Sequence, residues 1–193
     1  MFLINNIRKI LFPFYKEKKI KEILQILNSD KKNNAMLVGG CVRNFLNNEK
    51  IGDIDIATIF TPEEIIKKFS NTSFRIIKSG IEHGTITLSK EGKNFEVTTL
   101  REDVVTDGRH AKVSFTKDWK KDSERRDFTI NAIYLDQNGK IFDPQNGAQN
   151  LKEKKIKFIG DPHKRIEEDY LRILRFLRFS IQYKDFDKDD QTF

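Results

Sequence analysis

The chain has 193 residues, of which 37% are hydrophobic and 34% are charged, and its formal net charge is +7. This balance is typical of a globular protein with a highly charged surface, and the excess of basic residues favours a polyanionic partner such as nucleic acid. A single cysteine excludes an internal disulfide and a multi-cysteine zinc site, and no apolar run approaches the ~20 residues that span a bilayer.

The first half of the chain predicts alternating helices and strands. Residues 16–28 place Ile20, Ile23, Leu24 and Leu27 at the spacing of an amphipathic helix. The elements expected next are a buried strand at 35–38 that ends in a glycine turn, a helix at 41–48, a strand at 53–58, a helix at 62–69 that Thr61 caps, and strands at 74–80, 85–90 and 95–100. The basic and apolar segment before residue 16 contains too many polar residues for a signal peptide.

The second half predicts a strand pair and then a long helix. Residues 131–136 and 140–144 form the strand pair, and the helix begins near Lys164. Its expected apolar stripe consists of Ile166, Tyr170, Ile173, Leu174, Leu177 and Ile181. Because the strands include hairpins and do not alternate with helices at a regular βαβ period, we expect an α+β protein with a mixed sheet flanked by helices.

Two aspartates stand one residue apart in the strand expected at 53–58. Side chains alternate along a strand, so Asp53 and Asp55 point to one face and repel each other unless a positive charge lies between them. A divalent cation with oxygen ligands, such as Mg²⁺, would fit this pair. The alternative is a solvent-facing edge strand whose acids pair with nearby lysines.

Two neighbouring features favour the metal interpretation. Gly39 and Gly40 lie between a strand and a helix, where backbone N–H groups can approach a phosphate, and Arg43 follows one turn later. Glu96 lies on the polar face of its strand and could supply a third carboxylate, or it could be an ordinary exposed acid. No P-loop motif is present, which argues against a P-loop NTPase.

Six segments occur in an order that resembles one enzyme family. They are LVGGCVRNFL, GDIDIAT, TTLREDVVTDGRHAKVSF, SERRDFTINAIYLD, IFDPQNGAQNLKEKKIKFIG and RIEEDYLRILRFLRF. Together they resemble class II tRNA nucleotidyltransferases, the CCA-adding enzymes, which are close relatives of bacterial poly(A) polymerases within the polymerase-β-like superfamily. The resemblance covers roughly residues 35–183.

The resemblance implies a domain plan and an activity. We expect an amphipathic helical leader over 1–30, a polymerase-β-like nucleotidyltransferase head over 31–160, and the first neck helix with a polar tail over 161–193, with the family's body and tail domains absent. The implied activity is template-independent transfer of CMP and AMP from CTP and ATP to the 3′ end of tRNA, with Mg²⁺ as cofactor. The alternatives are a poly(A) polymerase or A-adding enzyme, and an inactive RNA-binding head.

The resemblance also implies partners and a compartment. The tRNA 3′ end, CTP and ATP are the expected partners, a second chain that supplies body and tail domains is a further candidate, and no membrane is involved. We expect the cytoplasm, with an organelle as the alternative.

Carried over position by position, the resemblance implies a role for each motif residue. Asp53 and Asp55 are the expected Mg²⁺ ligands, and Glu96 is the expected third catalytic carboxylate. The expected nucleotide-binding residues are Gly40, Arg43, Arg126, Asp127, Asn131, Asp169, Arg172, Arg175 and Arg178. Asp107 and Arg109 resemble part of a flexible loop that assists addition of the terminal A. Asn44 replaces the family's usual Asp and keeps a hydrogen-bond acceptor, so we expect the local orientation to survive.

Base reading by Asp169 and Arg172 also has a physical basis. Their i, i+3 spacing predicts one shared helix face. A carboxylate accepts hydrogen bonds and a guanidinium donates them. Cytosine and adenine offer an amino donor beside a ring-nitrogen acceptor, whereas uracil and guanine reverse the pattern, so a fixed pair would select C and A. The alternative is a solvated i, i+3 salt bridge.

Overall fold

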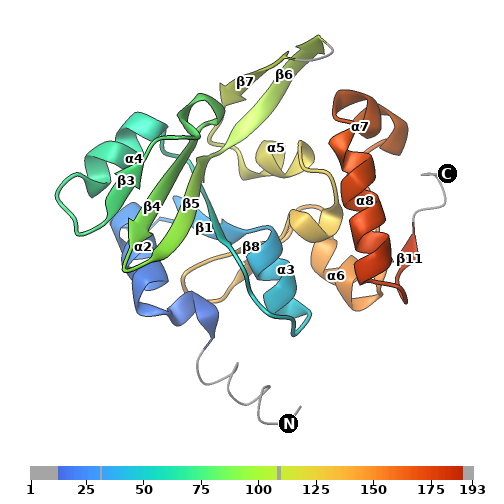
Figure 1. Cartoon of the computed structure of the whole chain (residues 1–193), viewed down its shortest axis with the longest axis horizontal. Helices are drawn as coiled ribbons and strands as arrows, with labels where there is room; N and C mark the ends of the chain where they lie inside the picture. The colour runs from blue at the N-terminus through green and yellow to red at the C-terminus, as the bar shows by residue number, and fades with distance from the viewer. Residues whose placement is uncertain (1–12, 31, 108–109, 189–193) are drawn as a thin grey trace.

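A seven-stranded mixed sheet forms the centre of the computed structural model, which describes residues 13–30, 32–107 and 110–188 (Figure 1). The strand order is β3-β4-β5-β2-β1-β8-β9, in which β2 and β5 run parallel and the other neighbours antiparallel. The strands are β1 (Ala35–Val38), β2 (Ile54–Thr58), β3 (Arg75–Ile77), β4 (Thr85–Lys90), β5 (Lys93–Thr99), β8 (Tyr134–Leu135) and β9 (Ile141–Phe142). The predicted mixed sheet is confirmed.

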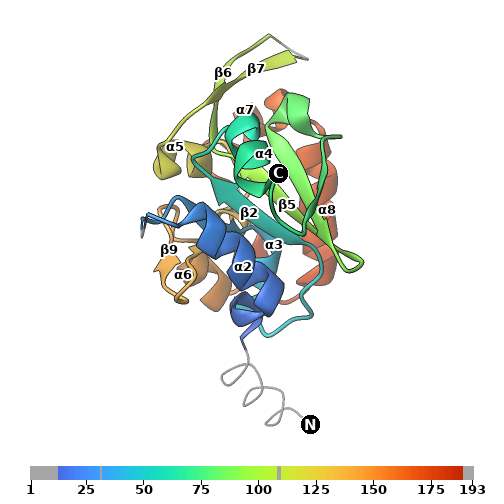
Figure 2. The ribbon, with the colours of Figure 1, turned by 90° about the vertical axis from the view of Figure 1, so that its left-hand side faces the viewer.

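Helices α2 (Lys18–Leu27) and α4 (Pro62–Phe69) cover one face of the sheet (Figure 2). The four predicted apolar residues of α2 are fully buried in the core that this face shares with both helices. Helix α4 begins as predicted: the Thr61 hydroxyl accepts from the backbone N of Glu64, and the Glu64 carboxylate accepts from the backbone N of Thr61 at 2.8 Å. This reciprocal cap fixes where the helix starts.

The opposite face of the sheet carries a smaller apolar cluster beside α5 (Trp119–Glu124). Val38 of β1 pairs with Asp55 on one side and with Tyr134 on the other. Side chains of directly paired residues point to the same face, so Asp55 shares this face with Val38 and Tyr134. The sheet therefore presents a carboxylate on the face that the large core does not occupy.

A second, aromatic core lies between α3 (Gly40–Leu46), α6 (Gly147–Lys152) and α8 (Leu171–Gln182). Phe128 packs against Phe158 in a tilted arrangement, with ring centroids 4.5 Å apart, and both rings contact Phe176 of α8. The strands β10 (Lys155–Ile156) and β11 (Asp187–Lys188) pair in parallel and return the chain to this core. Residues on both sides of position 160 thus share one cluster.

The prediction of a single helix that begins near Lys164 is wrong in two respects. The segment forms α7 (Pro162–Glu168) and α8, separated at Asp169, whose backbone is extended with φ −157° and ψ 102°. In addition, α8 buries Phe176 and Phe179, whereas most of the expected apolar stripe faces outward. The exposed members are Tyr170, Ile173, Leu174, Leu177 and Ile181, together with Leu171. The larger aromatic rings occupy the core side because they pack on Phe128 and Phe158.

A two-stranded ribbon, β6 (Arg101–Asp107) and β7 (His110–Phe115), projects from the body of the fold (Figure 1). Asp107 ends β6, and the expected loop residue Arg109 lies outside the described residues. The short 3₁₀ helices are η1 (Phe14–Lys16), η2 (Ile81–His83) and η3 (Thr129–Asn131). Across the part of the chain that the structure describes, no helix has the length and apolar character needed to cross a membrane.

Candidate active site

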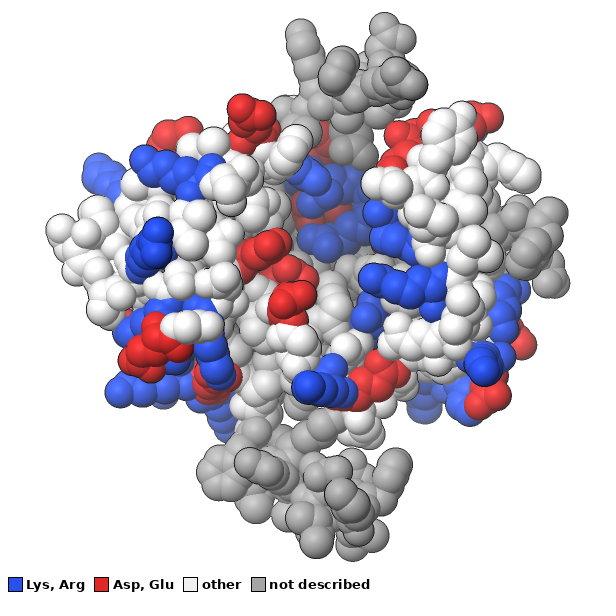
Figure 3. All heavy atoms as spheres, viewed as in Figure 1, with Lys and Arg blue, Asp and Glu red and all other residues white. Residues whose placement is uncertain are grey.

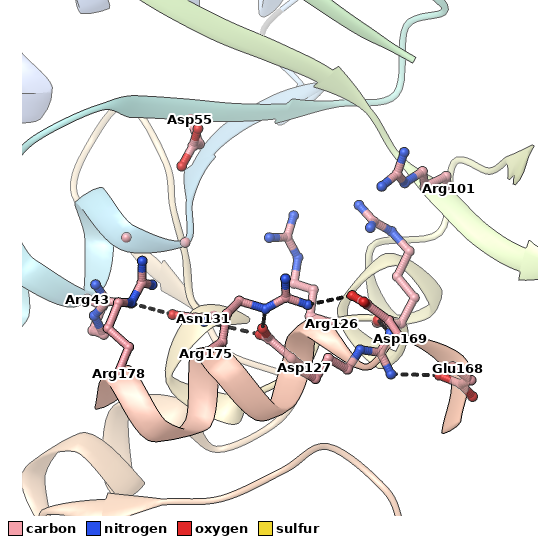
Figure 4. Close-up of a pocket in the computed structure, with 14 residues that line it drawn as sticks. Arg43, Asp55, Arg101, Arg126, Asp127, Asn131, Glu168, Asp169, Arg175 and Arg178 are labelled. Atoms are coloured by element: carbon pink, nitrogen blue, oxygen red, sulfur yellow. Dashed lines mark hydrogen bonds and ion pairs between the residues drawn. The ribbon is translucent and has the colours of Figure 1, made fainter. Parts of the chain in front are cut away.

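A cavity of about 590 Å³ opens between the sheet and helices α7 and α8 (Figures 3 and 4). Seven arginines and four acids contribute to its lining, and blue spheres gather in the hollow at the centre of Figure 3. The lining residues are Gly39, Gly40, Arg43, Asp55, Arg101, Arg125, Arg126, Asp127, Asn131, Glu168, Asp169, Arg172, Arg175 and Arg178. This excess of fixed positive charge suits a polyanionic ligand.

Asp55 stands on the sheet wall of the cavity. In the parallel pair β2–β5, Asp55 lies directly opposite Glu96, so both carboxylates share one face. Burial and the charge of Glu96 raise the pKa of Asp55 to about 6; Asp53 adds to the rise and Arg126 opposes it. The negative charge crowded here is what a bound cation would neutralise.

Asp53 and Glu96 lie at the edge of this site. Asp53 precedes β2 in a bend, although the sequence predicted it inside the strand, and both side chains are exposed. Neither is among the cavity-lining residues that the structure describes. Within the described ranges, no group of three or more His, Cys, Asp or Glu side chains is gathered so as to hold a metal ion.

Asp55 and Arg126 both approach the Gly39–Gly40 turn. Gly39 has φ +74°, in the left-handed region that favours glycine. A Cβ placed on Gly39 would lie 3.6 Å from Oδ2 of Asp55 and 4.0 Å from Nη1 of Arg126. The carboxylate and the guanidinium thus both face the turn from which α3 begins.

Five of the predicted nucleotide-binding residues form one continuous hydrogen-bonded chain (Figure 4). Arg43 donates to Asn131, whose amide donates to Asp127 at 3.1 Å. Arg175 then links two acids, because its Nε donates to Asp127 at 2.6 Å and its Nη2 to Asp169 at 2.8 Å. The chain joins residues that lie up to 132 positions apart in the sequence into one wall.

Arg43 is held from three sides. Besides Asn131, its guanidinium donates to Oδ1 of Asn44, with Nη2 at 2.9 Å, and lies 4.8 Å above the ring centroid of Phe179. Arg178 contacts the same ring at 5.0 Å. Asn44 therefore helps to orient Arg43.

Asp169 does not lie on one continuous helix face with Arg172, which corrects the geometry predicted from their spacing. It occupies the break between α7 and α8, where its Oδ1 accepts from the backbone N of Leu171 at 2.9 Å. Its Oδ2 accepts from Arg175. The carboxylate acts as a cap for the start of α8, which explains why a helical pattern in the sequence concealed the break.

Arg172 is nearly buried, with 7% of its surface exposed. Its Nη1 donates to Glu168 at 2.6 Å and to the backbone O of Arg165 at 2.8 Å, and its Nη2 donates to the backbone O of Arg125. Its Nε is buried without an acceptor in the part of the chain that the structure describes. Arg172 and Asp169 still line the same cavity, each with its own anchor.

Sequence reasoning missed four residues of the site. Arg101, Arg125 and Glu168 line the cavity, and Asp122 supports two of its arginines from behind. Burial alone would raise the pKa of Asp122, but Arg126, Arg125 and the hydrogen bond from Tyr134 bring it to about 2. The i, i+3 and i, i+4 spacing of Asp122 to the two arginines was a usable signal.

The chain is similar to curated proteins that are named as CCA-adding enzymes. It is 51% identical over 159 residues to the human CCA tRNA nucleotidyltransferase 1, mitochondrial, covering 81% of this chain and 37% of that protein. It is 44% identical over 161 residues to a CCA-adding enzyme of Streptococcus pyogenes, covering 82% and 39% respectively. The chain thus spans less than two fifths of the length of these two relatives.

Solved structures of CCA-adding enzymes are also similar to this chain. The Bacillus stearothermophilus CCA-adding enzyme in complex with CTP matches with a TM-score of 0.77 and 35% identity, over 89% of this chain and 40% of that one. A tRNA nucleotidyltransferase complexed with a primer tRNA and an incoming ATP analogue matches with a TM-score of 0.69 and 29% identity, over 88% and 47%. The family model for the poly(A) polymerase head domain matches residues 35–157. The chain therefore belongs to the poly(A) polymerase head domain family, which confirms the family predicted from its motifs.

Proposed function

We propose that this chain is the head of a tRNA nucleotidyltransferase that transfers CMP and AMP from CTP and ATP to the 3′ end of tRNA and releases pyrophosphate. The observation that carries the proposal is one cavity in which Asp55 from the sheet faces a wall of arginines. Similar proteins solved with CTP, and with tRNA and an ATP analogue, support the choice of substrates.

Asp53 and Asp55, with Glu96 beside them, are the residues that would hold Mg²⁺. The raised pKa of Asp55 supports this fit, because burial and the neighbouring carboxylates destabilise its charge until a cation arrives. Three protein carboxylates do not gather into a closed site in the described residues, which suits Mg²⁺, an ion that keeps waters and substrate phosphates in its shell. When bound, the metal would lower the pKa of the attacking hydroxyl and offset negative charge in the transition state.

The remaining wall would bind the nucleotide. Arg43 and Arg126, near the Gly40 turn, are placed to contact the triphosphate, and guanidinium groups suit phosphate oxygens. Asp127 and Asn131 hold Arg43 and Arg175 in position and would contact the ribose side. Arg175 and Arg178 from α8 complete the basic surface, and their charge would compensate the phosphates of the bound nucleotide.

Asp169 and Arg172 would read the base. Both side chains line the cavity, so a base bound there would approach the carboxylate of Asp169 and the guanidinium of Arg172. The amino group of cytosine or adenine would donate to Asp169, and the ring nitrogen would accept from the guanidinium of Arg172. Uracil and guanine present a ring N–H instead, so they would leave the site with unpaired polar groups.

The RNA partner requires surface beyond this cavity. On the outward face of α8, 61% of the surface of Leu174 and 49% of the surface of Leu177 are exposed. We propose that a helical segment, from a second chain or from a longer form of this protein, packs on this face and completes the grip on tRNA. Asp107, at the end of β6, and Arg109, which lies outside the described residues, would assist addition of the terminal A. We propose the cytoplasm as the compartment, with an organelle as the alternative; the free thiol of Cys41 fits the reducing conditions of either.

Incubation of the chain with tRNA that lacks its 3′ end, Mg²⁺ and one labelled nucleotide at a time tests the proposal. CCA addition predicts products longer by two residues with CTP and by one further residue with CTP and ATP together. Long products with ATP alone would identify a poly(A) polymerase, and extension of tRNA ending in CC by ATP, without any incorporation of CTP into tRNA that lacks its 3′ end, would identify an A-adding enzyme. Tight tRNA binding without any extension would identify an inactive RNA-binding head.

A further inference from the structure

Asp122 is a buried carboxylate behind the arginines of the cavity. It lies on α5 with 1% of its surface exposed. Its Oδ1 accepts from Nε of Arg125 at 2.9 Å and from the backbone N of Arg101 at 3.2 Å. Its Oδ2 accepts from the Tyr134 hydroxyl at 2.8 Å and from Nη2 of Arg126 at 3.1 Å. These donors satisfy both oxygens, which keeps the group ionised although it is buried.

Tyr134 connects this carboxylate to the sheet. Because Val38 pairs with both Asp55 and Tyr134, the three residues form one row across the sheet with their side chains on one face. Tyr134 is fully buried, and its hydroxyl donates to Asp122 and accepts from Nε of Arg126 at 3.3 Å. The same row of the sheet thus sets the position of Asp55 and, through Tyr134, that of the arginine that faces it.

An arginine with this support is prepared to bind before its ligand arrives. A free arginine side chain has many rotamers, and fixing them on binding reduces affinity. Arg126 is held at its Nε and Nη2 by Tyr134 and Asp122, while its Nη1 is directed toward the turn at Gly39. We propose that Asp122 and Tyr134 are positioning residues that hold Arg126 beside Asp55 for the triphosphate of the incoming nucleotide. This inference rests on the proposed function, which supplies the triphosphate.

Two variants separate the contribution of the Tyr134 hydroxyl from that of the Asp122 carboxylate. Tyr134→Phe removes one hydroxyl and keeps the ring, the carboxylate and both arginines. Asp122→Asn removes the charge that Arg125 and Arg126 share, so the two guanidiniums would repel each other, and a larger effect follows. Asp136→Asn is the matched control, because Asp136 is also buried, with 4% exposed, but accepts from the backbone N of Asn138 and Lys140.

The test is a titration of the chain with CTP and with cytidine, followed by the NMR shifts of backbone amides. We expect Tyr134→Phe to weaken CTP binding about tenfold, the size expected for a lost hydrogen bond to a charged group, and Asp122→Asn to weaken it further. Binding of cytidine, which has no phosphate, should stay unchanged in both variants. The effect of Tyr134→Phe should vanish in an Arg126→Lys background, because Tyr134 would have no guanidinium left to orient.

Three results would overturn the positioning role. They are unchanged CTP binding in Tyr134→Phe, an equal loss for cytidine and CTP, and an undiminished effect in the Arg126→Lys background. If Asp122→Asn does not fold, Tyr134→Phe alone decides the matter. A wild-type chain that binds no CTP contradicts the proposed function itself, whereas normal wild-type binding with unaffected variants overturns the positioning role alone.

Discussion

The two walls of the cavity are held in place by different forces. On the sheet wall, the position of Asp55 follows from strand register, since it pairs with Val38 on one side and Glu96 on the other. On the helix wall, ion pairs fix the side chains: Arg175 bridges two acids, and Arg172 binds Glu168. Backbone pairing is shared by many residues, whereas an ion pair depends on two. We therefore expect single substitutions to alter recognition on the helix wall more readily than geometry on the sheet wall.

The largest expected effect is on the sheet wall. Asp53→Asn or Asp55→Asn should lower the rate of nucleotide transfer at least roughly ten-thousandfold, because each change removes a proposed ligand of the metal that stabilises the transition state. CTP binding should stay within about threefold of wild type, since the arginines remain. Single-turnover transfer and CTP titration measure the two quantities. Near-normal transfer by either variant at saturating Mg²⁺ would remove that residue from the metal site.

Substitutions on the two faces of α8 should differ in their effect on the free energy of unfolding. Phe176→Ala should lower the free energy of unfolding by about 3–5 kcal/mol, because Phe176 is 4% exposed and packs on Phe128 and Phe158. Leu174→Ala should change it by less than about 0.5 kcal/mol, because Leu174 is 61% exposed. Urea unfolding measures both. A comparable loss in the two variants would mean that the outer face of α8 is already covered in solution.

Titration of the Asp55 carboxylate should make the stability of the fold depend on pH, which is a smaller effect. Its pKa is about 6 in the folded chain, above the unfolded value near 3.9, so the folded state binds more protons between these values. Stability should therefore fall as pH rises from about 4 to 6. Asp55→Asn should remove this fall and be about 1–3 kcal/mol more stable than wild type at pH 7.5 without divalent cations.

Urea unfolding at pH 4 and 7.5, with and without Mg²⁺, measures this effect. Added Mg²⁺ should restore the stability of the wild type at pH 7.5 and leave Asp55→Asn almost unchanged. The same pH slope in wild type and variant would show that Asp55 is not the titrating group.

Local patterns in the sequence predicted the helices that cover the far face of the sheet, and the family resemblance predicted most residues of the helix wall, but neither predicted how the helix wall is held in place. Periodicity placed the four buried residues of α2, and capping chemistry placed the start of α4 at Thr61. The break at Asp169 was missed because a residue that caps α8 also fits a continuous helical pattern. The anchor of Arg126 was missed in part, because its contact with Tyr134 depends on the sheet and is not visible as spacing alone.

The central claim is that the helix wall selects the base while the sheet wall performs the chemistry. The most direct test is kcat/KM for CTP, UTP, ATP and GTP in wild type and Asp169→Ala, with Glu167→Gln as a control that removes an exposed charge nearby. The account predicts that Asp169→Ala reduces the preference for CTP over UTP and for ATP over GTP roughly ten- to a hundredfold, as expected for the loss of a hydrogen bond to a charged group. If Asp169→Ala slows all four nucleotides equally and keeps both preferences, the helix wall does not read the base.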